Sequence, residues 1–258
     1  MTKPRCIDLL VLIIYIILLV PLVLFFKVSF LVSTILFFVV PSAYLAVRGP
    51  LPWKRILYAS FLFGFLLFLM DFLAEFNQAW IVPKLFFTHK IFSTVSVDIL
   101  IWGFFWILFI LIFYEHFLEH DRSNKISRRF KILGVALLVI FLVILAKFFV
   151  SPSKLSIPFI YLFLGVAASL LFLLIILKTK KPGILLHKFL LVCLFFAFVH
   201  LVHELTALKL GQWYFPGQYI GNVNILGIIF PIEEFFFWIL ISAGVTLSYY
   251  EYFVDDEK

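Results

Sequence analysis

Residues 200–238 read HLVHELTALKLGQWYFPGQYIGNVNILGIIFPIEEFFFW, and this stretch decides how the whole chain is interpreted. It places two adjacent carboxylates, Glu233 and Glu234, inside an apolar run that is otherwise long enough to cross a bilayer. A third carboxylate, Glu204, ends the preceding apolar run. Ionisable groups at such depth cost about 2.5–3.5 kcal/mol each on membrane-insertion scales, so we expect these side chains to serve a function.

The composition of the whole chain is that of an integral membrane protein. Of its 258 residues, 65% are hydrophobic and 20% are aromatic, which exceeds the apolar content of soluble globular domains. The net charge of +7 does not require a nucleic-acid partner to explain it, because basic residues gather on the cytoplasmic loops of membrane proteins. No nucleic-acid partner is therefore predicted. Cys6 and Cys193 lie in or beside different apolar runs, so no disulfide framework is expected.

Eight apolar stretches each provide the roughly 20 residues that a membrane-spanning helix needs. They are Ile7–Phe26, Val28–Val47, Ile56–Phe76, Ser93–Phe117, Ile132–Val150, Pro158–Leu177, Leu186–Leu208 and Ile228–Phe253. With the N-terminus in the cytoplasm, 15 of the 21 basic residues fall on the cytoplasmic side. The sequence therefore predicts an all-α polytopic helical bundle in the cytoplasmic membrane, with both the N-terminus and the C-terminus facing the cytoplasm.

Pairs of acidic and aromatic residues recur along the chain at nearly constant offsets. Asp71 and Trp80 match Glu204 and Trp213 at an offset of 133, Asp98 and Trp102 match Glu234 and Trp238 at 136, and Tyr114–Phe117 matches Tyr250–Phe253 at 136. We therefore predict two repeats of four helices, residues 1–130 and 131–258. Because four is an even number, both repeats run the same way through the membrane, and the axis relating them lies along the membrane normal.

The repeat also predicts where a functional site lies. Residues four apart share a helix face, so Glu234 and Trp238 point the same way, as do Asp98 and Trp102. Glu233 points about 100° away from Glu234 on α-helical geometry. The first repeat has an apolar residue at the position matching Glu233, so we expect it to lack one acid.

The connectors between the last two helices of each repeat contain further aromatic residues. Residues 80–92 and 213–227 are apolar and are interrupted by proline or glycine. They are expected to cover the site from the outer side. Trp80, Trp213 and Tyr214 either belong to this cover or form an aromatic belt at the membrane interface, and the sequence leaves both interpretations open.

Three elements of the second half resemble one known family. They are Gly211–Tyr219 (GQWYFPGQY), Leu226–Gly227 and Phe230–Phe237 (FPIEEFFF). Together they resemble the lycopene cyclase domain of the membrane-integral, heterodimeric or fungal-fusion type. That family carries tandem repeats, each with an acid before a W-x-Y-like element and then a Pro-x-Glu-Glu signature opening the last helix. The resemblance covers about residues 55–118 and 187–253, and it is closer in the second range.

The resemblance implies a lycopene cyclase-like enzyme that closes a ring at the end of a carotenoid. Pro231, Glu233 and Glu234 match the family signature, and Glu204 matches the upstream acid. The first repeat departs from the pattern, because Val95–Asp98 (VSVD) stands where Pro-x-Glu-Glu is often found. The activity of the first repeat and the identity of the substrate therefore remain open.

The chemistry of such a reaction fits these residue types independently. A proton adds to the terminal alkene of an acyclic isoprenoid, an internal alkene captures the carbocation, and a proton leaves, without any change of oxidation state. The reaction needs a carboxylic acid that stays protonated near neutral pH, and burial beside a second carboxyl group favours that state. We therefore predict Glu204, Glu233 and Glu234 as the catalytic residues.

Aromatic faces stabilise a carbocation without trapping it as a nucleophile would. The residues expected to bind the substrate are Asp71, Asp98, Trp80, Trp213, Tyr214, Pro231, Phe235, Phe236, Phe237, Trp238 and His200. No G-x-G-x-x-G motif or P-loop occurs, so no nucleotide cofactor is predicted, and no metal is assigned. The expected partners are a lipophilic carotenoid or other isoprenoid and the lipid bilayer, and either a homodimer or a heterodimer is compatible with the sequence.

Two other functional classes stay open at this point. An intramembrane metalloenzyme could use His200, Glu204 and the paired glutamates as ligands, because His200 and Glu204 share a helix face. A non-catalytic carotenoid-binding protein or a proton-coupled membrane protein could use buried histidines and glutamates as a proton relay. Hydrogen bonds within the bundle could also account for His200 and His203 without any function.

Overall fold

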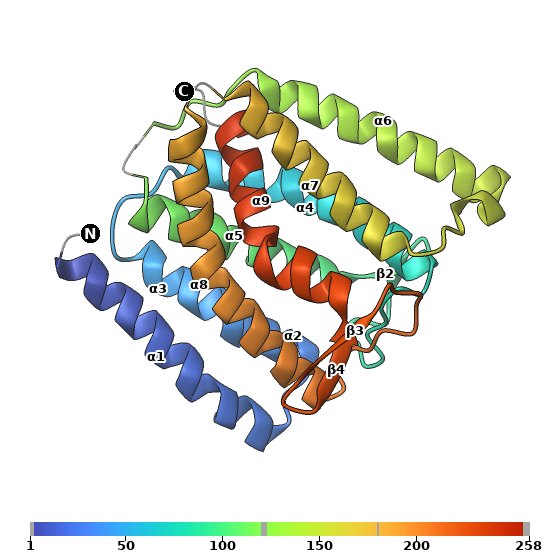
Figure 1. Ribbon diagram of the computed structural model, residues 1–258, viewed down its shortest axis with the longest axis horizontal. Coiled ribbons are helices and arrows are strands. Elements are labelled where there is room, and N and C mark those ends of the chain that lie inside the picture. The colour runs from blue at the N-terminus through green and yellow to red at the C-terminus, as the bar shows by residue number, and fades with distance from the viewer. Residues whose placement is uncertain (1–2, 120–122, 180, 255–258) are drawn as a thin grey trace.

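A computed structural model gives the fold of residues 3–119, 123–179 and 181–254, and these residues are mostly helical (Figure 1). Arg122, Lys180 and Lys258, which contribute to the predicted charge bias, lie outside these ranges. Within the described ranges, six helices are long and apolar enough to cross a membrane. They are α1 (Lys3–Phe26), α4 (Trp53–Phe76), α5 (Val97–Phe117), α6 (Arg129–Val150), α7 (Ile160–Lys178) and α8 (Pro182–Lys209). This arrangement is consistent with the predicted membrane helical bundle.

The second predicted span is helical, but it is divided into three segments. α2 (Phe30–Thr34) and α3 (Val40–Ala46) flank a π-helical turn, η1 (Ile35–Val39). Pro41 follows this turn, and a proline has no N–H with which to continue the α-helical hydrogen bonds. The N–H of Val40 instead bonds to the carbonyl of Ile35, five residues back, as in a π-helix.

The eighth predicted span also differs from a single helix. It begins as strand β4 (Ile228–Pro231) and continues through η3 (Glu234–Leu240), α9 (Ser242–Tyr249) and η4 (Tyr250–Val254), where η3 and η4 are π-helical. A 3-10 turn, η2 (Pro152–Leu155), connects α6 to α7.

In the described part of the chain, two short antiparallel hairpins accompany the helices of this mostly helical fold. β1 (Lys90–Ile91) pairs with β2 (Val95–Ser96), and β3 (Asn222–Ile225) pairs with β4. The turn of the second hairpin is Leu226–Gly227, with φ of 53° and 81°. Positive φ at both central residues matches the twist of a two-residue hairpin, and this favours glycine. Strands this short were hidden in the sequence by the apolar runs around them.

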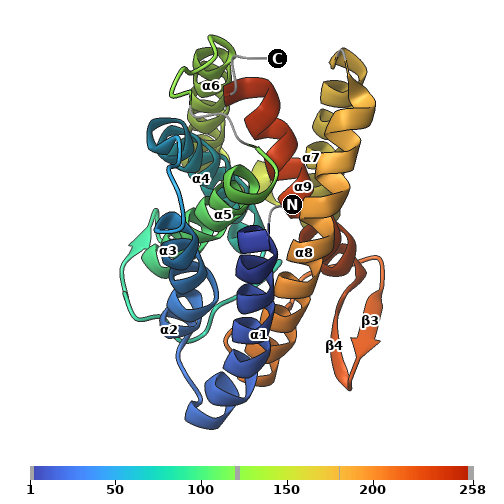
Figure 2. The same ribbon diagram turned by 90° about the vertical axis from the view of Figure 1, so that its left-hand side faces the viewer.

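α5 lies at the centre of the bundle, between α3, α4 and α9 (Figure 2). In its most apolar stretch 72% of the residues are buried, against 17% in both α6 and α7. The Ser96 side chain caps α5 by accepting a hydrogen bond from the Ile99 N–H, and Asp98 in the first turn complements the helix dipole. α6 lies at the edge of the bundle, where its exposed apolar residues suit contact with lipid (Figure 1).

The bundle has two distinct ends. α1 begins and η4 finishes at one end, here called the terminal end, whereas the β3–β4 hairpin lies at the other, here called the hairpin end (Figure 1). At the terminal end, the buried guanidinium of Arg55 lies 2.9 Å from a carboxylate oxygen of Glu115. The Tyr250 hydroxyl accepts from Arg55 at 2.8 Å and donates to Glu115 at 2.5 Å. This cluster joins the first half of the chain to the second.

A second cluster repeats these contacts with the halves exchanged. Lys188 lies 3.3 Å from a carboxylate oxygen of Glu251 and donates to the Tyr114 hydroxyl at 2.7 Å. Tyr114 in turn donates to Glu251. Lys188 follows Arg55 by 133 positions, and Tyr250 and Glu251 follow Tyr114 and Glu115 by 136, which are the offsets found in the sequence.

Candidate active site

A largely apolar cavity of about 120 Å³ lies between α4, α5, α7, α8 and the η3–α9 segment. Three carboxyl groups line it, those of Asp71, Glu204 and Glu234. All three belong to buried residues. The cavity thus brings together side chains from both halves of the chain, and all three of these acids were predicted to belong to the site.

Five of the six tryptophans of the chain line this cavity: Trp80, Trp102, Trp106, Trp213 and Trp238. The Trp102 and Trp238 rings have centroids 5.1 Å apart, and Trp106 stacks on Trp238 at 4.5 Å. Trp80 lies 5.8 Å from Trp102 and 6.4 Å from Trp213. The wall therefore consists of large π-systems, which attract a cation without offering it a nucleophile.

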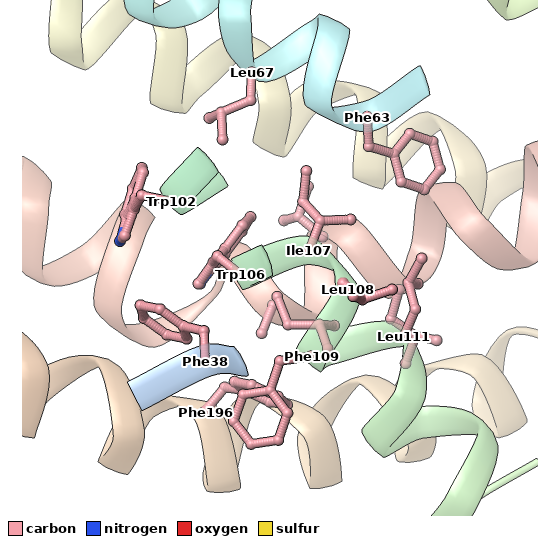
Figure 3. Close-up of a cluster of buried hydrophobic side chains, with 14 of the residues drawn as sticks. Phe38, Phe63, Leu67, Trp102, Trp106, Ile107, Leu108, Phe109, Leu111 and Phe196 are labelled. Atoms are coloured by element: carbon pink, nitrogen blue, oxygen red, sulfur yellow. The ribbon is translucent and has the colours of Figure 1, made fainter. Parts of the chain in front are cut away.

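Figure 3 shows the Trp102 and Trp106 side chains beside Leu67 of α4, which is also part of the cavity wall. Trp102 and Trp106 are four residues apart on α5, so they share one face of that helix. Leu67 fits closely against the same helix, because a Cβ atom added at Gly103 would lie 2.3 Å from its Cδ2. The aromatic wall is thus held by close packing between α4 and α5.

The carboxyl groups of Glu204 and Glu234 lie close together in the cavity, within reach of a hydrogen bond between them. A hydrogen bond between two carboxyl groups requires that one of them carries a proton. The Trp213 indole N–H donates to Glu204 at 2.8 Å, and the Tyr161 hydroxyl donates to Glu234. Each carboxyl group of the pair thus has a neutral hydrogen-bond donor beside it, and a proton shared between the two would be buried.

Glu233, which was predicted to be catalytic together with Glu234, does not line the cavity, whereas Glu234 does. The Oε1 atom of Glu233 accepts a hydrogen bond from the Ile220 N–H at 2.8 Å, and its side chain is buried against the connector. Asp98 likewise bonds to the connector of the first half. Its two carboxylate oxygens accept hydrogen bonds from the N–H groups of Phe86 and Phe87 at 3.1 and 2.9 Å. Ile220 follows Phe87 by 133 residues, so the structural counterpart of Asp98 is Glu233 and not Glu234.

The π-helical segment η3 explains this difference in register. Asp98 and Trp102 are four residues apart on an α-helix, whereas Glu233 and Trp238 are five apart across η3. A π-helix bonds residue i to residue i+5, so it brings Trp238 over Glu233 as an α-helix brings Trp102 over Asp98. The second half therefore has one additional residue between two matching contacts, and Glu234 lies within this inserted turn.

His200 and His203 lie behind the aromatic wall. The Trp106 indole N–H donates to His200 Nε2 at 2.6 Å, and the His200 ring lies nearly parallel to Trp238 with centroids 6.2 Å apart. The His203 ring is held between Phe37 and Phe38, at 4.9 Å from each. Among the described residues, no group of three or more His, Cys, Asp or Glu side chains could hold a metal ion, so the metalloenzyme alternative has no ligand set there.

The other predicted residues of the signature segment divide between wall and surface. Phe237 lines the cavity and packs over Gly165, where a Cβ atom would lie 2.3 Å from its ring. Phe235 and Phe236 lie outside the cavity lining, and Phe236 is half exposed. Pro231 ends β4 at the start of the helical segment.

The aromatic residues of the connectors were expected either to cover the site or to form a belt at the membrane interface, and the structure separates them. Trp80 and Trp213 are buried cavity residues and not an interfacial belt. Tyr214 is half exposed and lies outside the cavity lining. Its backbone forms an antiparallel bridge with Ile81, with N–H to O distances of 3.0 and 3.1 Å, so the two connectors are joined over the site.

Sequence reasoning missed Tyr161, Trp106, Phe215 and Tyr219. Trp106 could have been found, because it lies one turn beyond Trp102. Tyr161 lies at the start of an apolar helix, and no motif or spacing in the sequence indicates that its hydroxyl belongs to a site. Burial, together with the neighbouring Glu234 and Glu233, raises the pKa of the Tyr219 phenol, so it stays neutral and donates to the Ala79 carbonyl.

Comparison with known proteins adds no assignment: no protein-family model, curated protein or solved structure matches this chain.

Proposed function

We propose that this protein is a membrane enzyme that cyclises an acyclic isoprenoid end group by acid catalysis, as a lycopene cyclase does with a carotenoid. The observation that carries this proposal is that Glu204 and Glu234 line one cavity, close to each other, together with five tryptophans. A proton store next to π-systems suits a reaction that creates a carbocation and must keep water away from it.

The residues of the pair have distinct proposed roles. Glu234 donates its proton to the terminal alkene, so its O–H bond breaks and a C–H bond forms. Tyr161 then stabilises the carboxylate that remains on Glu234 through its hydroxyl. Glu204 holds the pair in place through its bond from Trp213 and returns a proton to Glu234 between turnovers.

The indole faces stabilise the positive charge while the ring closes. The cation first lies on the more substituted carbon of the protonated alkene, and the π-electrons of the internal alkene form the new C–C bond. Trp102, Trp106 and Trp238 stack around this space with centroids 4.5–6.4 Å apart. Loss of a neighbouring proton restores an alkene, so substrate and product are isomers and no redox cofactor takes part.

We further propose that the bundle consists of eight spans in two repeats, related by an axis along the membrane normal, with both termini in the cytoplasm. The broken helices of residues 30–46 and 232–254 supply the two spans beyond the six long helices. The exchanged ion clusters at the terminal end and the Trp80–Trp213 and Trp102–Trp238 contacts support the repeat. The predicted charge bias supports the orientation in the cytoplasmic membrane.

Expression in a bacterial host that accumulates lycopene tests the proposed reaction. We expect cyclised carotenoids in cells carrying the intact gene, and lycopene alone in cells carrying a Glu234→Gln variant expressed at the same level. Chromatography and mass spectrometry of the pigments distinguish these outcomes, because cyclisation changes retention but not mass. Unchanged lycopene that copurifies with the intact protein would instead favour the non-catalytic carotenoid-binding alternative.

A further inference from the structure

We propose that Asp71 accepts the proton which the substrate loses and that Glu75 passes this proton to solvent at the hairpin end. This inference rests on the proposed function and adds a proton acceptor and an exit route to it. Asp71 lines the cavity from α4, whereas the donor pair Glu204–Glu234 comes from α8 and η3. Donor and acceptor therefore belong to different walls of the same cavity.

The Asp71 carboxyl group is buried and only partly satisfied. The residue is 7% exposed, and its Oδ2 atom has no hydrogen-bond partner among the residues that the structure describes. A buried carboxyl oxygen without a partner is costly, so its retention in an apolar cavity calls for a function. A free lone pair beside an aromatic wall is what removal of a proton from a carbocation requires.

Glu75 links Asp71 to the surface of the protein. It lies four residues after Asp71 on α4, and residues at this spacing are neighbours on one helix face. The two carboxyl groups are close enough to interact electrostatically. The Glu75 side chain is 8% exposed and lies 3.6 Å from Nζ of Lys90, whose side chain is 39% exposed. A proton can thus move from the cavity to solvent through two carboxyl groups, first that of Asp71 and then that of Glu75, which pairs with the partly exposed Lys90.

The reaction needs such a route because donor and acceptor differ. In each turnover Glu234 loses a proton to the alkene, and the Asp71 carboxylate gains the proton whose C–H bonding electrons form the product alkene. Asp71 then transfers this proton to Glu75, and Glu75 releases it to water beside Lys90. The Glu204–Glu234 pair regains a proton from water when the product leaves, so the protein returns to its starting state.

An isotope experiment with the purified full-length protein in lipid nanodiscs tests the route. The substrate is a fully deuterated acyclic carotenoid in ordinary water. If the lost deuteron escapes through Glu75, each ring gains one hydrogen and loses one deuterium, and the product is one mass unit lighter per ring than the substrate. If the deuteron instead returns to the donor pair, later products keep the mass of the substrate.

We expect the unaltered protein to lose deuterium fully and Glu75→Gln to retain it increasingly over successive turnovers. Glu75→Asp restores the carboxyl group and should restore the loss. Lys90→Gln leaves the cavity intact but removes the cation that favours the Glu75 carboxylate, so it should also increase retention. Deuterium loss that is identical in Glu75→Gln and the unaltered protein would refute the route alone. Absence of any cyclised product from the unaltered protein would refute the proposed function and, with it, the route.

Discussion

The indole rings of Trp102 and Trp238 lie against each other with centroids 5.1 Å apart and planes inclined by 31°, although 136 residues separate them in the chain. Trp102 of α5 and Trp238 of η3 occupy matching positions in the two halves of the chain, so the contact joins two equivalent residues. Such a contact between matching residues supports the two-fold relation that we propose for the two halves. The cavity is built around this contact, and it is therefore shared by both halves.

The Glu204–Glu234 pair leads to a prediction that separates two adjacent glutamates. Glu234→Gln keeps size and polarity but removes the donated proton, so turnover should fall about 10²–10⁴-fold, the usual contribution of general acid catalysis. Glu233→Gln changes a side chain outside the cavity lining that accepts a hydrogen bond from the Ile220 N–H, and it should keep most activity. Product formation at equal protein levels measures both variants.

A larger loss of turnover in Glu233→Gln than in Glu234→Gln would contradict this prediction. Asp98→Asn is a further control, because Asp98 makes the contact in the first half that Glu233 makes in the second. It should behave like Glu233→Gln, with a modest loss of stability and little loss of turnover.

Much of the candidate site could be predicted from the sequence, because its residues stand out against an apolar background. Asp71, Glu204 and Glu234 were identified since carboxyl groups are rare inside membrane spans. Trp80, Trp213 and the matching offsets indicated that both halves contribute. These inferences depend on residue type and on approximate offsets along the chain, which one extra residue in a helix does not obscure.

Glu233 was grouped with Glu234, but it lies outside the cavity lining, because the face that a residue presents depends on the local helix winding. Counting four residues per helical contact paired Asp98 with Glu234, whereas the π-helical segment η3 pairs Asp98 with Glu233. No residue in FFFW signals a π-turn. Tyr161 was missed for a related reason, since its role arises from the packing of α7 against η3 and not from any spacing along the chain.

The buried ion pair Arg55–Glu115 predicts a large loss of stability on removal of one partner. Both side chains are at most 1% exposed, so Arg55→Met should destabilise the protein by about 3–5 kcal/mol by leaving a buried charge unpaired. Thermal unfolding in detergent measures the loss, and the buried thiol of Cys193 provides the probe through a thiol-reactive dye in a Cys6→Ser background.

The Lys188 cluster is the matched control for this prediction. Lys188→Met removes the corresponding cation, but its side chain is 14% exposed, so water can replace the lost contacts and the loss should be smaller. The double variant Arg55→Met, Glu115→Gln should recover part of the stability, because no unpaired charge remains. Equal losses for Arg55→Met and Lys188→Met would contradict the interpretation.

The close packing of Phe237 over Gly165 predicts a loss of both stability and turnover in Gly165→Ala. The added Cβ would lie 2.3 Å from the Phe237 ring, so this ring must move within the cavity wall, at a cost of about 1–3 kcal/mol. Gly64→Ala on α4 is the control, since among the described residues its added Cβ would meet no atom within 4 Å beyond its chain neighbours and its own helix backbone. Thermal unfolding and product formation should be altered in the first variant and nearly unchanged in the second.

The inserted residue in η3 leads to the last prediction, which concerns register. Deletion of Phe236, a half-exposed residue outside the cavity lining, should convert the π-helical turn to an α-helical one. Glu233 and Trp238 would then be four positions apart, as Asp98 and Trp102 are in the first half. The helix beyond the deletion keeps its register, whereas the Glu234 side chain turns away from Glu204.

The deletion variant should therefore fold and yet lose the carboxyl pair, with a fall in turnover as large as that of Glu234→Gln. Infrared spectroscopy gives a direct measurement, because a protonated, hydrogen-bonded carboxyl group has a C=O stretching band that Glu234→Gln should also remove. Phe236→Ala is the control that trims the same side chain and keeps the chain length, and it should retain both the band and the activity. Since π-turns cost stability and persist mainly at functional sites, the deletion should also raise the unfolding temperature. A deletion variant with the carboxyl band intact would show that η3 does not position Glu234.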